Sequence, residues 1–192
     1  MLEMRALEDA YLESEDAIVR SGFHGGRARW VAERSPLVEA IHRDGHFLDV
    51  GCANGLLVAD VVDWAAERGH RIVPHGVDLG PRLVDLARKR LPGHAGNFVV
   101  ADAWAWEPAR GWTFVYSLLD LSPDELWCDW IRRLYDWVEP GGRLIMGSYG
   151  SRSRAMPPID VTPVLESCGL RVRGSSVGGE GPVTRFAWAS RA

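Results

Sequence analysis

The stretch that decides the fold is His46-Phe-Leu-Asp-Val-Gly-Cys-Ala-Asn-Gly-Leu-Leu-Val-Ala-Asp60. The apolar run Phe47–Val50 predicts a strand, and the apolar residues from Leu56 onward recur at helical spacing. Gly51 and Gly55 mark the loop between the two. Glycine lets a ligand approach the backbone because no Cβ blocks it, and a helix that begins here presents free N–H groups. Strand, glycine loop and helix together predict the opening unit of a nucleotide-type binding site.

The loop lacks the glycines that a dinucleotide-binding loop needs. That fingerprint is Gly-x-Gly-x-x-Gly, whereas the three positions here hold Gly51, Ala53 and Leu56. Asp49 stands just before the loop, and a carboxylate repels phosphate and attracts a cation. The sequence therefore indicates a ligand with a positive group near Asp49.

The motif Asp-Val-Gly-Cys-Ala-Asn-Gly at residues 49–55 resembles the first motif of class I S-adenosylmethionine-dependent methyltransferases. The resemblance extends through most of the chain from about residue 45. It implies a cofactor, S-adenosyl-L-methionine, whose ammonium and sulfonium agree with the charge argument. In this family the loop holds the methionine part of the cofactor, so the resemblance implies that Asp49, Gly51 and Gly55 bind it. A plain strand-to-helix turn capped by Asn54 is the alternative interpretation.

Beyond the loop, strand and helix patterns alternate along the chain. Further strands are predicted at 72–77, 97–101, 113–119 and 142–147, and helices at 56–68, 81–91, 123–138 and 161–168. Residues 170–175 and 183–190 alternate around a glycine-rich turn and predict an antiparallel hairpin. The pattern predicts an α/β fold, with a doubly wound, mostly parallel sheet of about seven strands, an antiparallel edge hairpin and N-terminal cap helices. Ligands in such folds bind at the carboxyl ends of the strands.

The 192 residues suit one domain with a small appendage. We expect residues 1–44 to form an N-terminal helical cap and residues 45–192 to form the Rossmann-like methyltransferase core. Apolar spacing predicts helices over 2–20 and 27–42, separated by the break at 21–26, and Pro36 can begin a new helix. These helices are expected to cover the cofactor cleft and to shape part of the acceptor pocket.

Two further acids end predicted strands. Asp78 follows the glycine loop at about the 20-residue spacing of nucleotide folds, where a carboxylate can accept both hydroxyls of a ribose. A helix N-cap at Asp78 is the alternative. The resemblance implies that Asp102 and the Ala103 N–H meet the adenine. Leu79, Trp104 and Ser117 complete the expected cofactor contacts, with Trp104 packing on the adenine face or, equally, in the core.

Methyl transfer from a sulfonium is an in-line displacement, in which the protein aligns the reactants and excludes water. A base is not required, and the catalytic residues are not identified by the sequence. Asp120, after the fourth strand, and His24, in the glycine-rich break, are the candidates for one. A loop carboxylate near Ser122 and a solvent-exposed loop histidine are the competing interpretations.

The acceptor is expected to be a small organic molecule, methylated at oxygen or nitrogen. The stretch 116–122 lacks the Asn/Asp-Pro-Pro-Tyr motif of family members that act on nucleobase or glutamine nitrogens. The formal net charge is −4, with no dense cluster of Lys and Arg, which disfavours a nucleic acid partner. Two alternatives remain: a non-catalytic S-adenosylmethionine-binding protein of the same fold, and an NAD-type oxidoreductase, which the missing loop glycines disfavour.

Cys52, Cys128 and Cys168 are far apart in the sequence and include no Cys-x-x-Cys pair. This pattern predicts neither a disulfide framework nor a zinc site, and it favours a reducing cytoplasm. The histidines show no metal-ligand spacing, so no metal is expected. No stretch resembles a secretory signal or a membrane span. We therefore expect a cytoplasmic monomer or homodimer that does not interact with membranes.

Overall fold

The structure is a computed structural model of the chain, and it describes residues 8–152, 155–181 and 183–192. Its seven-stranded sheet has the order β3-β2-β1-β4-β5-β7-β6. The strands are β1 (Gly45–Val50), β2 (Ile72–Asp78), β3 (Phe98–Val100), β4 (Trp112–Leu118), β5 (Val138–Tyr149), β6 (Val172–Gly178) and β7 (Thr184–Ser190). β7 pairs antiparallel with β5 and β6, and the other neighbouring pairs are parallel. The predicted fold class is confirmed, including the edge hairpin.

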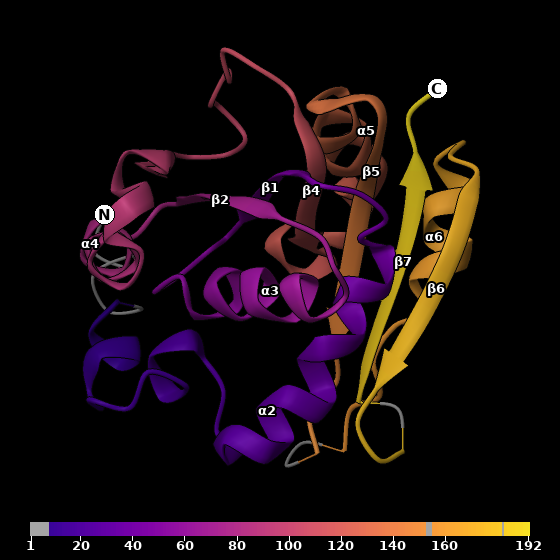
Figure 1. The fold of residues 1–192 in the computed structure, drawn as a ribbon. Coiled ribbons are helices and arrows are strands. Elements are labelled where there is room, and N and C mark those ends of the chain that lie inside the picture. The colour runs from indigo at the N-terminus through magenta and orange to yellow at the C-terminus, as the bar shows by residue number, and fades with distance from the viewer. Residues whose placement is uncertain (1–7, 153–154, 182) are drawn as a thin grey trace.

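Helices cover both faces of this sheet (Figure 1). They are α2 (Gly26–Arg34), α3 (Leu56–Glu67), α4 (Pro81–Arg90), α5 (Trp127–Asp136) and α6 (Val161–Ser167). The short 3-10 helices are η1 (Val19–Ser21), η2 (Ser35–Ala40), η3 (Pro92–Asn97), η4 (Leu119–Leu121) and η5 (Asp124–Leu126).

Two hydrophobic cores lie on the two faces of the sheet. Neighbouring residues of a strand point to opposite faces, so Phe47 packs with α2, η2 and α3 while Leu48 packs with α5 and α6. A smaller cluster under α4 includes Val84 and Phe98. These layers leave the carboxyl ends of β1, β4 and β5 as one rim of the sheet, and the residues before β1 contribute to that rim.

The segment before β1 differs from its prediction. Residues 8–12 are helical, but turns follow them until η1, so the helix predicted over 2–20 is wrong beyond residue 12. Its first part, residues 2–7, lies outside the described residues. The Asp16 side chain accepts a hydrogen bond from the Ile18 N–H at 2.7 Å, and such local bonds compete with the helix. The helix predicted over 27–42 corresponds to α2 and η2, and η2 begins at Ser35-Pro36.

Cys128 and Cys168 form a disulfide between α5 and the end of α6. The expectation that these cysteines remain unpaired is therefore wrong. The two residues are 40 positions apart in the sequence, and their Cα atoms lie 5.0 Å apart because α5 and α6 pack on the same face. Nothing in the cysteine spacing indicates this proximity. Cys52 is free and buried.

Across residues 8–152, 155–181 and 183–192, no helix has the length and apolarity needed to cross a membrane. The same residues contain no group of three or more His, Cys, Asp or Glu side chains arranged to hold a metal ion. His46 and His75 make a pairwise contact, with Nδ1 of His46 2.9 Å from Nε2 of His75.

Candidate functional site

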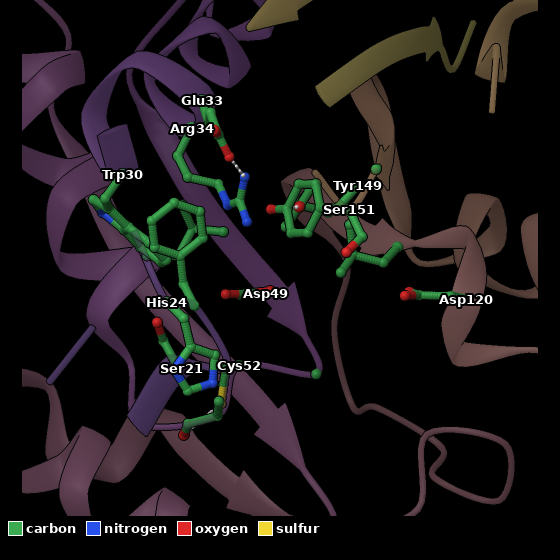
Figure 2. Close-up of a pocket in the computed structure, with 18 of the residues that line it drawn as sticks. Ser21, His24, Trp30, Glu33, Arg34, Asp49, Cys52, Asp120, Tyr149 and Ser151 are labelled. Carbon is green, nitrogen blue, oxygen red and sulfur yellow. Dashed lines mark hydrogen bonds and ion pairs between the residues drawn. The ribbon is translucent and has the colours of Figure 1, made fainter. Parts of the chain in front are cut away.

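A cavity of about 480 Å³ opens at the carboxyl ends of β1, β4 and β5, where the fold predicts a ligand site (Figure 2). The strand ends and the loop after β1 form one side of it, and the N-terminal segment and α2 form the other. Its lining includes Tyr11, Phe23, His24, Arg29, Trp30, Glu33, Arg34, Asp49, Gly51, Cys52, Ala53, Tyr116, Leu118, Asp120, Tyr149 and Arg152.

Asp49 is a buried carboxyl group on this cavity. Its burial, together with the nearby Asp78, raises the pKa of Asp49 to about 8. A cation placed beside such a group stabilises its charged form. The position of Asp49 therefore agrees with the positively charged ligand that the sequence predicts.

The two glycines of the loop serve different purposes. Gly51 lines the cavity with φ +88°, and a Cβ built there would lie 2.5 Å from a methyl carbon of Leu121. Gly55 has φ +71°, and its Cβ would come within 2.8 Å of Ala87. Gly51 is thus required by its positive φ and by the nearby Leu121, whereas Gly55 allows α3 to pack closely against α4.

Asp78 ends β2 and holds the loop in place. One carboxylate oxygen accepts the Ala53 N–H at 2.8 Å, and the other accepts the Gly80 N–H at 2.8 Å. Burial raises the pKa of Asp78. Each carboxylate oxygen has a second lone pair, so these bonds leave acceptor capacity for a ligand. The buried Glu8 lies beside this group and accepts the Arg82 N–H at the start of α4 at 2.9 Å.

The remaining predicted cofactor residues do not line the cavity. Leu79, Asp102 and Trp104 are exposed after β2 and β3. Asp102 accepts the Trp104 N–H at 2.9 Å, and the Trp104 ring lies 4.9 Å from that of Trp130. The Ala103 carbonyl accepts a bond from Arg133, and Ser117 is fully buried, with its hydroxyl 3.4 Å from the Val50 carbonyl.

Of the predicted residues, the cavity therefore brings together Asp49, Gly51, His24 and Asp120, while Gly55, Asp78, Leu79, Asp102, Ala103, Trp104 and Ser117 lie outside it. His24 and Asp120 are both exposed at its rim. The surface of Asp120 is exposed, but the protein around its carboxylate displaces part of its hydration and raises its pKa.

Two tyrosines meet inside the cavity, the buried Tyr116 and the half-buried Tyr149. The hydroxyl oxygens of Tyr116 and Tyr149, at the ends of β4 and β5, lie 2.5 Å apart. Burial is the main cause that raises the pKa of each hydroxyl. Both tyrosines are therefore neutral hydrogen-bonding groups at ordinary pH.

Arg34 is the main residue of the site that sequence reasoning missed. Its guanidinium carbon lies 3.5 Å from the centre of the Tyr149 ring, inside the cavity. The available signal was a cluster of arginines around Trp30 in α2, but an arginine on a short helix is ordinarily exposed. Arg27, from the same cluster, instead pairs with Asp60 on α3.

Residues 47–142, half of the chain, match a family model described as a methyltransferase domain. The chain belongs to the class I S-adenosylmethionine-dependent methyltransferases. The resemblance drawn from the motif at residues 49–55 is thereby confirmed. This methyltransferase family uses S-adenosylmethionine as its cofactor.

Curated relatives match part of this methyltransferase chain. Trans-aconitate 2-methyltransferase from Rhizobium leguminosarum bv. trifolii (strain WSM2304) is 33% identical over 99 residues, covering 50% of this chain and 36% of the relative. The tRNA N(3)-methylcytidine methyltransferase trm140 from Schizosaccharomyces pombe (strain 972) is 25% identical over 137 residues, covering 64% and 43%. The matched regions thus span less than half the length of these relatives.

Solved structures share the fold over nearly the whole chain. Magnesium protoporphyrin IX methyltransferase from Synechocystis PCC 6803, with bound SAH, has a TM-score of 0.66 at 15% identity and covers 98% of this chain and 99% of its own. The N-methyltransferase NodS from Bradyrhizobium japonicum WM9 has a TM-score of 0.65 at 13% identity, covering 98% and 97%. At these identities the likeness concerns the fold alone.

Proposed function

We propose that this protein transfers a methyl group from S-adenosylmethionine to an oxygen or nitrogen of a small organic molecule. The proposal is supported chiefly by one observation, a single cavity that extends from the glycine loop to α2. Its volume of about 480 Å³ is typical of small-molecule sites. Asp49 and Asp120 line it from the strand ends, and Trp30, Glu33 and two arginines line it from α2.

The residues near the loop fit the cofactor. The buried carboxyl group of Asp49 suits an ammonium. Burial raises the pKa of Asp49 because it disfavours the carboxylate, and a neighbouring cation would stabilise that carboxylate. Asp78 would accept the ribose hydroxyls, and Gly51 leaves its backbone accessible. The other proposed cofactor contacts are Gly55, Leu79, Asp102, Ala103, Trp104 and Ser117.

When bound, S-adenosylmethionine would supply a methyl group on a sulfonium. An acceptor lone pair would bond to the methyl carbon as the carbon–sulfur bond breaks, and the acceptor would release a proton. The chain itself aligns the acceptor and excludes water. Phe23, Trp30 and Tyr149 provide walls for an organic molecule. Asp120 and His24 lie at the rim, where either can take up the released proton.

The N-terminal residues 1–44 would act as the cap of this site. Tyr11 and Phe23 line the cavity, and the Asn54 side chain donates a hydrogen bond to the Ala17 carbonyl at 2.7 Å. The cap is thus tied to the same loop that is proposed to hold the cofactor. A cavity closed in this way favours a small acceptor over a polymer.

The proposal is tested with methyl-labelled S-adenosylmethionine. The purified protein is incubated with trans-aconitate, with a small-molecule extract and, separately, with tRNA, since a tRNA methyltransferase is among the relatives. Label in a small-molecule product supports the proposal, and label in tRNA alone contradicts it. Tight SAH binding without transfer to any of them would favour a non-catalytic binding protein.

The cofactor assignment is tested with Asp78→Ala. We expect at least about a tenfold loss of SAH affinity, or about 1.4 kcal/mol, by calorimetric titration. Circular dichroism checks that the fold is retained. Asp85→Ala on α4 is the control, because Asp85 is exposed and pairs only with Arg88 among the described ion pairs. Unchanged affinity in Asp78→Ala removes the ribose assignment.

A further inference from the structure

The charged groups that line the cavity come from the strand ends, from α2 and from the segment after β5. Asp49 and Asp120 belong to the side formed by the strand ends. Around α2, the buried Glu33 carboxylate faces three guanidinium groups: Arg29 at 2.6 Å, Arg34 at 3.6 Å and Arg152 at 3.9 Å. One carboxylate cannot balance three cations, so this end of the cavity carries excess positive charge.

Arg34 is the most deeply buried of these cations, with 5% of its surface exposed. Its Nε and Nη1 atoms are buried and have no hydrogen-bond partner in the described part of the chain. The 3.6 Å separation from Glu33 permits electrostatic attraction but is too long for a hydrogen bond. A buried charged donor without an acceptor destabilises the protein, because it loses its hydration without gaining a hydrogen bond. An acceptor within hydrogen-bonding distance of the guanidinium would satisfy these donors, and Arg34 lines the cavity through which one can approach.

Aromatic rings hold the Arg34 guanidinium in place. Its carbon lies 3.5 Å from the ring centre of Tyr149, 4.9 Å from that of Phe23 and 5.3 Å from that of Trp30. In Figure 2 the Arg34 side chain extends from α2 toward Tyr149. The rings limit the movement of the cation and provide apolar surface beside it. Such a site suits an organic group that carries a carboxylate, since a guanidinium pairs with carboxylate through two parallel N–H bonds.

Arg34 and the glycine loop contact the cavity from different elements. Arg34 packs on Tyr149 at the end of β5, whereas the glycine loop follows β1, and β4 lies between these two strands. Tyr116 on β4 pairs in register with Asp49 on β1, and its hydroxyl contacts that of Tyr149. The cofactor loop and the guanidinium therefore belong to different parts of one cavity.

We propose that Arg34 binds a carboxylate of the methyl acceptor, so that the substrates are small organic acids. This inference rests on the proposed methyl transfer. In it, the carboxylate serves to bind the acceptor to Arg34. The cofactor also carries a carboxylate, and the experiment must distinguish the two sources.

The test measures binding of benzoate and of benzamide to the SAH-saturated protein by calorimetry. The two probes have the same shape and differ in charge. We expect benzoate to bind at least about tenfold more tightly than benzamide. Arg34→Gln should remove this preference, and Arg34→Lys should keep part of it. Arg143→Gln is the matched control, because Arg143 also has a buried unpartnered Nε but does not line the cavity.

The cofactor arm compares SAH with 5′-methylthioadenosine, which lacks the amino-acid part. We expect the difference in affinity between these two ligands to be the same in the wild type and in Arg34→Gln. A difference that shrinks in the variant would assign Arg34 to the cofactor's carboxylate and overturn the proposal. Equal binding of benzoate and benzamide, or no binding of either to the SAH complex, also overturns it. Failure of the wild type to bind SAH would instead contradict the proposed function.

Discussion

At the scale of single residues, Asp49 makes ligand binding at the site depend on pH. Burial, with the nearby Asp78, raises its pKa to about 8, so the carboxyl group is mostly neutral in the free protein near neutral pH. An ammonium beside it would stabilise the carboxylate and lower this pKa. Binding of the cofactor therefore couples to loss of a proton.

We expect SAH binding to release up to about one proton near pH 7, and SAH affinity to increase between about pH 6 and about pH 8. The measurement is calorimetry in phosphate and in Tris, whose ionisation enthalpies differ. Asp49→Asn keeps the shape of the side chain and cannot ionise, so it should bind more weakly and release no proton. Proton release of the same size in this variant would contradict the assignment.

The residues of the site were predictable to different extents. Asp49 and Gly51 follow from charge and from the space that a ligand needs, both of which can be inferred from adjacent residues. Arg34 could not be predicted, because its burial depends on Phe23, Trp30 and Tyr149, which the fold brings together from separate elements.

At the scale of elements, Asp60 holds α2 against α3. Its carboxylate accepts two bonds from Arg27, at 2.5 and 2.7 Å, and one from the Trp30 indole N–H at 2.6 Å. Asp60 is buried, whereas the Arg27 side chain is half exposed. Because α2 carries Arg34, this contact also positions the arginine end of the cavity.

Asp60→Asn should lower the free energy of unfolding by about 2 kcal/mol, because an amide cannot accept all three bonds and places a donor against Arg27. This figure is below that of a fully buried pair, since water screens Arg27. Urea unfolding measures the loss. Asp63→Asn is the control. Asp63 is an exposed residue of α3, so this variant should change the free energy of unfolding little. A loss of the same size in both variants would refute the role of Asp60.

The disulfide between Cys128 and Cys168 links α5 to the end of α6. It closes a loop of 40 residues, so its removal should lower the free energy of unfolding by about 2–4 kcal/mol through the entropy of the unfolded chain. Guanidinium unfolding with and without reductant measures this difference. The variant with serine at both positions should not respond to reductant. A wild-type protein that does not respond either would contradict the cross-link.

Elements were predictable where the pattern is long and local. The strand and helix around Phe47–Val50 and Leu56 lie where the apolar periods place them. The helix predicted over 123–138 begins later, because residues 124–126 form the 3-10 helix η5 and α5 begins only at Trp127. The disulfide depends on the packing of α5 against α6, which the sequence does not encode in any short pattern.

At the scale of the whole molecule, His75 makes stability depend on pH. Burial first, and then the nearby His46, lower the pKa of His75 from 6.5 to about 4. The folded protein therefore favours neutral His75. Below about pH 6.5 the unfolded chain binds a proton at this histidine that the folded chain does not. The free energy of unfolding is therefore highest above that pH and decreases as pH falls toward about 4.

We expect the wild type to lose up to about 3 kcal/mol of stability from this residue between about pH 7 and about pH 4. His75→Gln cannot titrate, so its loss over this range should be smaller. Thermal unfolding across the range measures both proteins. His24→Gln is the control, because His24 is exposed at the cavity rim. Identical pH profiles for the wild type and His75→Gln would rule out this source of acid sensitivity.

The bond between Asn54 and the Ala17 carbonyl has a consequence for the kinetic cycle. The loop that would seat the methyl donor is bonded to the chain segment that also lines the cavity, and we expect the donor to exchange only while that segment is displaced. We therefore expect compulsory-order kinetics, in which the donor enters first and its demethylated form departs last. Product-inhibition patterns would then be competitive between those two compounds and non-competitive toward the acceptor.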